Sequence, residues 1–534
     1  MRLLILLLLA ASLALPLHFS RRKSITHDEV AHLPAGYSYL RTGKVVLNPM
    51  HPPLVKELCA LPLLFLPVEM PVPASAIDQA ILTSYQWKFG RLFFARNDVR
   101  RILGWCRLPA ALLSLGLALV VTLWSWELWG PRGALVSLFL YVFDPTITAH
   151  AQLVTTDVPL AFSATLFFLL LRRTVRCPSA GRLVAAGIGL GLALATKFSA
   201  VVFVPVALGL LAFGRASGAR LEDSSTASGP LGRRLRPVVS VLTSFALLLG
   251  LAAITVWAIY LFPSDPLFYW RGLESLQRDH LPNFDYILLG EVRQGRDPTY
   301  FLLAWLLKTP LPTIVLLAVA VVLFLRGQRA GALDESFLLV PLLAFFVCMS
   351  LFTDDLGVRY LIPCYPFGFI FTGRVGALLT RAKPRAAAAI VAALGWLAID
   401  FVAVSPDHLS YFNEIAGGPR RGPEWLDDSN VDWGQGLIEL REYLEERGLR
   451  DYSLCYFGAL PPRHYDIDGD LIPWSDALKP PRKTLILSGH FVARVRGVLR
   501  LEYGDGPENW IAHAEPTAVV GHAYWVYEPR PGSS

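Results

Sequence analysis

Residues 3–32 read LLILLLLAASLALPLHFSRRKSITHDEVAH, which is an apolar run, then three basic residues, then a polar and acidic stretch. Residues 3–19 reach the length that a membrane span needs. No small-residue cleavage motif follows them, so we expect a retained first span and not a cleaved signal peptide. The acidic stretch would then begin at the membrane–water boundary.

The composition of the whole chain predicts the same class. The 534 residues are 54% hydrophobic and only 17% charged, with a mean hydropathy of +0.46, values typical of a polytopic membrane protein. The formal net charge of +7 is explained by basic cytoplasmic loops and does not indicate nucleic-acid binding. The six cysteines form no C-x-x-C pair, so neither a structural zinc site nor a disulfide framework is indicated.

Apolar runs predict about eleven transmembrane helices. They lie near 3–19, 106–128, 132–149, 153–171, 183–196, 198–214, 237–261, 303–325, 337–352, 359–374 and 386–404. With the N-terminus inside, the basic stretches at 172–182, 215–236, 326–329 and 374–385 all fall in inner loops, as the positive-inside rule requires. Residues 214–236, rich in Gly, Ser and Arg, are interpreted as a disordered connector. Arg21, Arg22 and Lys23 break the rule, because they fall outside.

This topology places the first loop (20–105) and everything after Ser405 on the outer face. Within the loop, "HPPLVKELCALPLLFLP" (51–67) is interpreted as an amphipathic helix along the membrane. Residues 405–534 change in composition: "GLIELREYLEERG" (436–448) predicts a helix ending at Gly. "YSLCYF", "KTLILSG" and "AYWVYEP" predict strands. We therefore expect a transmembrane domain, 1–404, and a small soluble α/β domain, 405–534.

The stretch "SITHDEVAH" (24–32) resembles the zinc-protease signature H-E-x-x-H with one residue too many. His27 and His32 are five residues apart, about 140° around a helix, and so do not share a face. Asp28 and His32 do share one, which leaves half of a metal site or an orienting carboxylate–imidazole pair open. Asp28 and Glu29 could equally be a solvated capping pair. As a catalytic pair, Asp28 would act as a general base whose pKa is raised by partial burial.

Other polar residues lie at the outer ends of predicted spans, where charge is costly unless it is used or solvated. Asp157, Lys197 and Arg359 are the main examples, and the alternative for the two cations is snorkelling to lipid headgroups. His51 and His150 could be metal or hydrogen-bond partners, but a lone histidine is more often structural. The acidic "LDDSNVDWGQ" (426–435) could form a pocket wall or bind a cation, or could simply be a capped turn.

Several segments together resemble one known family. They are "THDEVAHLPAGYSYLRTG" (26–43), "NPMHPPLVKELCALP" (48–62), "FDPTITAHAQLVTTDVPLAFSATLFFLLLRR" (143–173), "LALATKFSAVVFVP" (192–205), "GVRYLIPCYPF" (357–367) and "DSNVDWGQGL" (428–437). In this order they resemble the polyprenyl- or dolichyl-phosphate-sugar glycosyltransferases, which include protein O-mannosyltransferases and the aminoarabinose transferases of lipid A. The tail is not the repeat-containing domain of the protein O-mannosyltransferases, which puts a protein acceptor in doubt.

The resemblance implies the C-type glycosyltransferase architecture and an inverting hexosyl or pentosyl transfer from a polyprenyl-phosphate sugar. It implies catalytic carboxylates at Asp28, with its neighbour Glu29, and at Asp157. The phosphate and sugar would be bound by Lys197, Arg359, Tyr360, His32 and His51. The acceptor would be a hydroxyl of a glycan, lipid or protein. Some relatives use a divalent metal and others do not, and this sequence shows no complete ligand set, so the metal stays open.

Two other functions compete with this interpretation. A transporter or flippase of lipid-linked sugars would place polar residues near the bilayer midplane, often in paired repeats. Here the charged candidates gather at one face, and no internal repeat is present. A non-catalytic scaffold would use the tail to bind a partner. The expected location is the bacterial inner membrane, with the active site and tail on the extracytoplasmic side.

Overall fold

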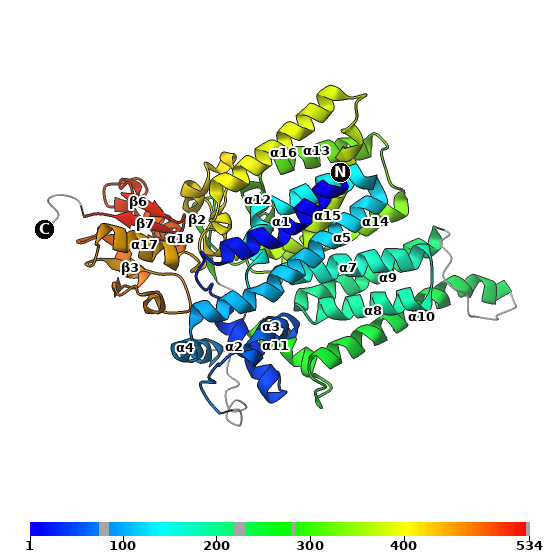
Figure 1. The fold of residues 1–534 in the computed structure, drawn as a ribbon, viewed down its shortest axis with the longest axis horizontal. Helices are drawn as coiled ribbons and strands as arrows, with labels where there is room; N and C mark the ends of the chain where they lie inside the picture. Colours follow the sequence, from blue (N-terminus) through cyan, green and yellow to red (C-terminus); the bar gives the residue numbers. More distant parts are fainter. Residues whose placement is uncertain (74–84, 218–229, 280–283, 530–534) are drawn as a thin grey trace.

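A computed structural model describes residues 1–73, 85–217, 230–279 and 284–529 of the chain. A bundle of apolar helices forms most of the molecule, and a small mixed domain lies at one end of it (Figure 1). Most of the connector predicted at 214–236 lies outside the described residues.

The bundle helices follow the predicted apolar runs. They are α1 (Arg2–Ser20), α5 (Val99–Val142), α7 (Asp157–Arg176), α8 (Ala180–Leu194), α9 (Phe203–Ala216), α10 (Pro230–Ile259), α12 (Tyr300–Lys308), α13 (Leu311–Leu325), α14 (Ala332–Phe352), α15 (Tyr365–Thr372) and α16 (Pro384–Val404). Short 3-10 turns, η3 (Phe198–Val202), η4 (Val358–Cys364) and η5 (Gly373–Leu378), extend α9 and α15. The fold is therefore that of an α-helical polytopic membrane protein.

The number of full-length spans is lower than the eleven predicted. Within the described ranges, eight helices are long and apolar enough to cross a bilayer, or nine if α12 and α13, bent by 113°, form one broken span. The predicted span 106–128 and residues 132–142 of the predicted span 132–149 belong to the single element α5, which folds back at Gly130, where φ is 69°. The Ser125 and Ser137 hydroxyls lie 2.8 Å apart and Tyr141 Oη donates to the Ser114 carbonyl at 2.8 Å, so the two arms are antiparallel.

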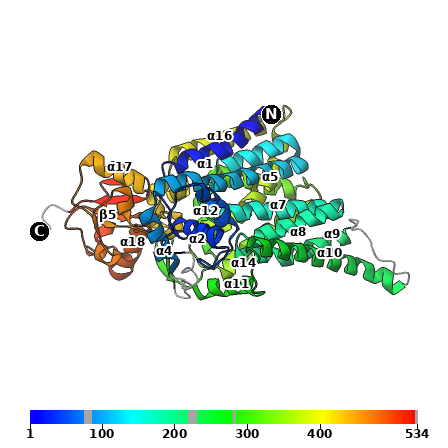
Figure 2. The same cartoon turned by 60° about the horizontal axis from the view of Figure 1, so that its bottom comes forward.

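The first loop folds onto the end of the bundle that faces the tail (Figure 2). It contains α2 (Glu29–Thr42), α3 (Leu54–Ala60) followed by the turn η1 (Leu61–Phe65), and α4 (Tyr85–Arg96). The helix predicted within 51–67 is confirmed, and Phe65 is 87% exposed at its end. Short elements α6 (Pro145–Ala151) and α11 (Phe268–Asp279) and the hairpin β1 (Asp285–Leu288) and β2 (Glu291–Gln294) complete the loops.

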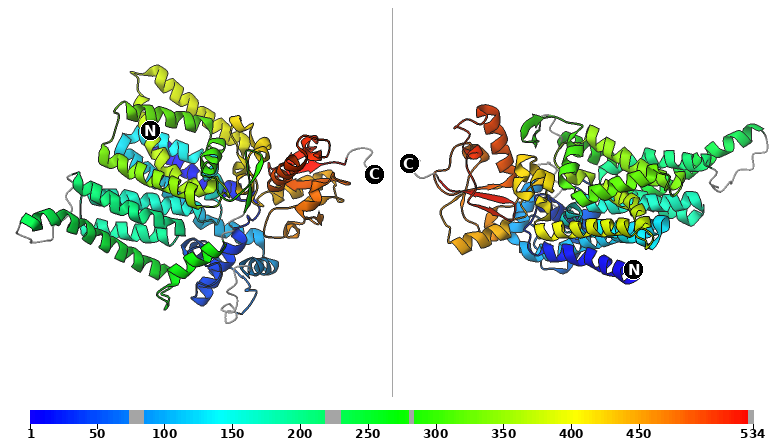
Figure 3. Two further views of the ribbon diagram at one scale, coloured as in Figure 1. Left: turned by 180° about the vertical axis from the view of Figure 1, so that it is seen from behind. Right: turned by 90° about the horizontal axis from the view of Figure 1, so that it is seen from above.

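The tail contains a five-stranded sheet of order β4-β3-β5-β7-β6, seen edge-on in Figure 3. Its strands are β3 (Ser453–Cys455), β4 (Asp470–Leu471), β5 (Leu485–Ser488), β6 (Ala518–Val520) and β7 (Tyr524–Tyr527), and its helices are α17 (Leu437–Arg447) and α18 (Gly489–Tyr503). β3 pairs in parallel with β4 and β5, while β7 is antiparallel to β5 and β6. The helix and three strands predicted from sequence are confirmed.

The tail and the first loop share one apolar core. Val30 and Leu33 of α2 and Phe93 of α4 belong to the same buried cluster as Leu437 and Leu440 of α17. Burying this surface removes apolar area from water, which stabilises the contact between the two parts. The tail is thus packed onto the loop that contains the acidic stretch.

Candidate active site

Four elements distant in sequence bring two carboxylates and two cations together. Asp28 precedes α2, Asp157 begins α7, Lys197 lies between α8 and η3, and Arg359 lies in η4. Arg359 Nη1 donates to Asp28 Oδ2 at 3.0 Å and lies 3.7 Å from Asp157 Oδ2. Lys197 Nζ donates to Asp157 Oδ1 at 2.6 Å. Charges of alternating sign therefore form a continuous chain, the charged cluster, of Asp28, Arg359, Asp157 and Lys197.

Two aromatic rings pack against the cations. The Tyr360 ring lies 4.4 Å from Lys197 Nζ and 5.0 Å from the Arg359 guanidinium carbon. The Trp433 ring lies 4.1 Å from the same guanidinium carbon. Such contacts fix the direction of a cation without neutralising its charge. Arg359 is held between two rings and a carboxylate, with its Nε buried and free of hydrogen bonds.

The accessibility of the two carboxylates differs. The Asp28 side chain is 20% exposed, whereas that of Asp157 is 1% exposed. Burial alone would raise the pKa of Asp28, but Arg359 and a hydrogen bond from His27 together hold it well below its ordinary value. The expectation of a raised pKa is therefore wrong for this state, because it left the Arg359 charge out. Burial and the Arg359 charge also keep the pKa of Lys197 below its ordinary value, in spite of Asp157.

Glu29, the neighbour of Asp28, points elsewhere and is fully buried. Its carboxylate accepts two hydrogen bonds from Arg107, at 2.9 and 2.7 Å, and one each from the Thr26 and Val154 backbone amides. Arg107 also donates to the carbonyls of Ser20, Lys23 and Ser24. Burial alone would raise the pKa of Glu29, but Arg107 and these donors lower it. The pair ties the acidic stretch to α5 and to the segment before α7.

The two predicted histidines lie beside the charged cluster. His32 Nδ1 contacts the Val154 carbonyl at 2.9 Å, and the ring of His51 meets that of His32 edge-on, with centroids 5.3 Å apart. The loop holding His51 is organised by Lys56, whose buried amino group donates to the His51 and Asn48 carbonyls. Burial keeps the pKa values of both histidines below the ordinary value, which favours their neutral forms.

The tail completes the wall around Arg359. Asn430 Oδ1 accepts the Val358 amide at 2.9 Å, and Ser429 Oγ donates to the Leu356 carbonyl at 2.8 Å. Gly357 permits this approach, because its φ is 150° and a Cβ there would lie 2.3 Å from Ser429 Oγ. In the acidic segment 426–435, Asp427 accepts from Arg494 and Asp432 accepts from the Gly434 amide. These hydrogen bonds fix segment 426–435 as a turn, and the turn places the Trp433 ring against Arg359.

An apolar groove lies within the bundle and shares the η4 segment with the charged cluster. It has a volume of 260 Å³ and is formed by α12, α13, α14 and the η4–α15 segment. Leu361, two residues after Arg359, lies in its wall, and Tyr365, Gly368 and Thr372 continue along it. The η4 segment therefore contributes Arg359 to the charged cluster and Leu361 to the wall of the apolar groove, and no residue of the cluster itself lines the groove. In the described part of the chain, no group of three or more His, Cys, Asp or Glu side chains is arranged to hold a metal ion.

Sequence reasoning placed Asp28, Asp157, Lys197, Arg359 and Tyr360 in one site, and the structure brings all five together. It missed Arg107, Lys56 and Trp433. Arg107 and Lys56 do have a signal in the sequence, since each is a lone cation inside an apolar run and needs a buried partner. Trp433 has none, because its contact with Arg359 depends on how the tail docks.

The comparisons with known proteins agree with the resemblance over part of the chain. Residues 102–226 match the model of the family described as dolichyl-phosphate-mannose-protein mannosyltransferase. This segment runs from the start of α5 past α9 and includes Asp157 and Lys197. No curated protein matches the chain by sequence.

Solved structures align over nearly the whole chain at low identity. ArnT from Cupriavidus metallidurans bound to undecaprenyl phosphate is 14% identical, with a TM-score of 0.46, and covers 98% of this chain and 97% of ArnT. The archaeal oligosaccharyltransferase AglB from Archaeoglobus fulgidus, in complex with an inhibitory peptide and a dolichol-phosphate, is 11% identical, with a TM-score of 0.44. That alignment covers 94% of this chain and 70% of AglB.

Proposed function

We propose that this chain is a membrane glycosyltransferase of C-type architecture that transfers a sugar from a polyprenyl-phosphate donor to an acceptor hydroxyl. The observation that carries the proposal is the charged cluster, assembled from four elements, one of which (η4) continues from Arg359 to Leu361 in the wall of the apolar groove. The match of residues 102–226 to a family of lipid-phosphate-sugar transferases supports it. We place the transfer machinery in residues 1–404 and the extracytoplasmic α/β domain in 405–534.

The donor has two chemically different parts, and each has a suitable environment. The polyprenyl chain is apolar, and the groove formed by α12–α15 offers a largely apolar lining for part of it. The phosphate carries negative charge and fits between Arg359 and Lys197, which present guanidinium and ammonium donors. Tyr360 holds both cations at that spacing.

The transfer needs a base for the hydroxyl and a counter-charge for the leaving group. The acceptor oxygen attacks the anomeric carbon, and the bond from that carbon to the phosphate oxygen breaks. The hydroxyl proton passes to the Asp28 carboxylate, and polyprenyl phosphate leaves against Arg359 and Lys197. A single displacement of this kind inverts the anomeric configuration.

Donor binding would also prepare the base. In the free protein, Arg359 stabilises ionised Asp28 and makes it a weak base. A phosphate that draws on the Arg359 charge weakens this pairing, so the pKa of the partly buried carboxylate rises. Asp157, almost fully buried, then acts as a positioning residue for Lys197 and Arg359, and Glu29 as a positioning residue for the loop that contains Asp28.

The test is mass spectrometry of lipid-linked sugars and envelope glycans in the host bacterium, comparing wild type, a deletion strain and Asp28→Asn. We expect both altered strains to accumulate one polyprenyl-phosphate sugar and to lose one decoration, with transfer in Asp28→Asn lowered at least about 100-fold. Asp468→Asn, an exposed carboxylate of the tail, is the matched control and should behave as wild type.

The outcomes separate the competing functions. Normal decoration in Asp28→Asn, with its loss in the deletion strain, would keep the enzyme and remove Asp28 as the base. Unchanged glycans in both strains would overturn the transferase. Movement of donor across proteoliposomes without any transfer would favour the transporter.

A further inference from the structure

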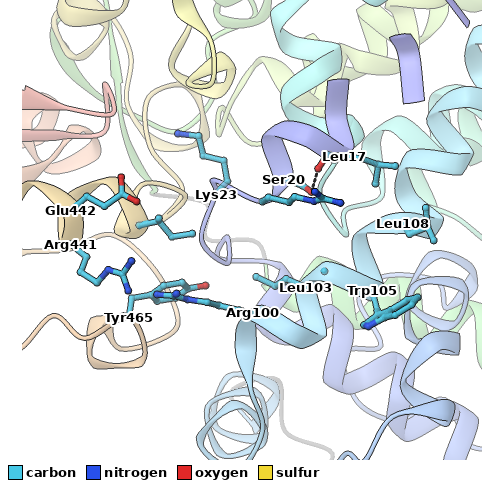
Figure 4. Close-up of a pocket in the computed structure, with 13 residues that line it drawn as sticks. Leu17, Ser20, Lys23, Arg100, Leu103, Trp105, Leu108, Arg441, Glu442 and Tyr465 are labelled. Atoms are coloured by element: carbon cyan, nitrogen blue, oxygen red, sulfur yellow. Dashed lines mark hydrogen bonds between the residues drawn. The ribbon is translucent and has the colours of Figure 1, made fainter. Parts of the chain in front are cut away.

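A second cavity lies where the bundle meets the tail, away from the charged cluster. This junction cavity has a volume of 620 Å³ and is lined by residues from the end of α1, the start of α5 and helix α17. Figure 4 shows Arg100, Arg441 and Tyr465 together on the tail side and Leu17, Trp105 and Leu108 on the bundle side. None of the residues of the charged cluster lines it.

The bundle side of the junction cavity is apolar and lies at the membrane boundary. Leu17 belongs to the last turn of α1, and Trp105 and Leu108 to the second and third turns of α5, which are both spanning helices. Trp105 is 52% exposed. Tryptophan prefers the headgroup level of a bilayer, where its ring is partly buried and its N–H is wet. This side of the cavity therefore opens toward lipid.

The cavity is also cationic. Arg21 after α1, Arg100 of α5 and Arg441 of α17 line it, against the single carboxylate of Glu442. Lys23 also lines it, but its amino group is engaged by Asp407 and Glu439. Among the described residues neither Arg21 nor Arg100 has an ion-pair partner. The pairs of Arg441 with Glu445 and Asp466 are long, at 3.7 and 3.6 Å, and its Nε is buried without a hydrogen bond.

We propose that the junction cavity binds the headgroup of an anionic phospholipid. The phosphate would lie among Arg21, Arg100 and Arg441, and the acyl chains would extend past Leu17, Trp105 and Leu108 along the bundle. Guanidinium groups match phosphate oxygens in charge and geometry, and an anion offsets the repulsion among the three cations. A free phosphate would leave the apolar side unfilled, which is why we commit to a lipid.

The site gives Arg21 a role that the topology rule does not. Basic residues are disfavoured on the outer side, yet Arg21 follows α1 directly on the side of the tail. Bound lipid would contact α1 and α5 as well as α17, and would therefore join the tail to the bundle. The proposal goes beyond the transferase function and does not depend on it.

The experiment uses the purified full chain in detergent. Native mass spectrometry measures retained lipid, and the melting temperature is followed with added phosphatidylglycerol, phosphatidylcholine or inorganic phosphate. Arg21→Gln/Arg441→Gln is compared with Arg22→Gln/Arg447→Gln, which removes the same charge from the same two segments at residues outside the cavity. We expect phosphatidylglycerol to stabilise wild type and control, and to bind the cavity variant at least tenfold more weakly.

Three results would overturn the proposal. They are equal stabilisation by phosphatidylcholine, an equal effect of inorganic phosphate, and unchanged lipid binding in the cavity variant. If that variant does not fold, brominated lipids replace it as a measurement on the intact site. The quenching of Trp105 fluorescence is measured as the difference in quenching between wild type and Trp105→Phe. This difference should be greater for brominated phosphatidylglycerol than for brominated phosphatidylcholine, and equal values would contradict the site.

Discussion

Asp28 and Glu29 are adjacent in the chain, but their carboxylates lie in different surroundings. Asp28 is partly exposed beside Arg359, whereas Glu29 is buried against Arg107. Glu29→Gln would leave the Arg107 charge buried without its partner, which typically costs about 3–5 kcal/mol. We therefore predict that Glu29→Gln lowers the melting temperature and the yield of folded protein, while Asp28→Asn keeps both close to wild type.

Thermal unfolding of both variants in the same detergent measures this difference. Activity per folded molecule should fall much further in Asp28→Asn than in Glu29→Gln. A Glu29→Gln protein that melts like wild type but has no activity would instead place Glu29 in the chemistry.

The pairing of Asp28 with Arg359 also sets a pH dependence. A base must be deprotonated, so its rate falls as the pH drops through its pKa. In wild type the Arg359 charge holds the pKa of Asp28 well below its ordinary value, so we predict that Asp28 causes no acid-side loss of kcat/KM above pH of about 4. In Arg359→Gln, Asp28 stays partly buried but loses the neighbouring positive charge, so its pKa should rise. The acid-side fall of the residual kcat/KM should therefore move to higher pH.

The measurement is a kcat/KM profile from pH 4 to 8. Lys197→Gln is the control, because Lys197 hydrogen-bonds to Asp157 and not to Asp28. Lys197→Gln should lower kcat/KM, but it should shift the acid-side fall of kcat/KM less than Arg359→Gln does. Identical acid-side falls in Arg359→Gln and wild type would show that Asp28 is not the titrating base.

Site residues could be predicted from the sequence where a charged residue lies at the end of an apolar run. Asp157, Lys197 and Arg359 have this signal, because an uncompensated charge there is costly. The roles of Asp28 and Glu29 could not be separated, since both follow the same span. Their difference depends on Arg107 and Arg359, which lie 78 and 331 residues away in the chain.

Among the elements, α15 provides a direct test of the apolar groove. Gly368 lies in its wall, and a Cβ added there meets no atom within 4 Å. A large side chain would fill the space that we assign to the polyprenyl chain. We predict that Gly368→Phe raises the KM for the donor at least tenfold and leaves the melting temperature nearly unchanged.

Gly395→Phe is the matched control, because Gly395 is an exposed glycine of α16 with equally open surroundings. Short-chain donor analogues separate the two explanations for any loss of activity. They should restore transfer in Gly368→Phe if the groove holds the chain, and failure to do so would exclude this assignment.

Long elements and three of the short strands were predictable from local pattern, but two of the shortest strands were not. Each spanning helix corresponds to a run of apolar residues, and α17 ends at Gly448, whose φ is 60°. The strands β4 and β6 have two and three residues, too few for alternation to show. Gly130 separates two predicted spans, but a glycine between two apolar runs does not by itself predict that the two arms of α5 pack against each other as a hairpin.

At the scale of the whole molecule, the tail is part of the site and not an appendage. Trp433 and Asn430 position Arg359 and its segment, and Lys23 joins the end of α1 to Asp407 and Glu439. The tail therefore has to lie on the same side of the membrane as Asp28. This follows from the contacts alone, whichever side that is.

The side itself can be decided with the chain's own cysteines. Helix α7 has 20 residues, about 30 Å, which matches the hydrocarbon core of a bilayer. Asp157 begins this helix and Cys177 follows it directly, so the two lie on opposite sides. Cys177 is exposed, and the other five cysteines are buried or half-buried. The basic residues Arg172, Arg173 and Arg176 beside Cys177 favour the cytoplasmic side for it.

We predict that a membrane-impermeant maleimide leaves wild-type Cys177 unlabelled in intact cells and labels it in inside-out vesicles. Glu446→Cys in a Cys177→Ser background, an exposed position of α17, should show the reverse. Labelling of Cys177 from outside would show that the topology is the reverse of the one proposed, with the charged cluster on the cytoplasmic side. The lipid-linked donor would then have to bind from the cytoplasmic leaflet. Labelling of both positions from one side would contradict α7 as a spanning helix, because the tail and Cys177 would then share a compartment.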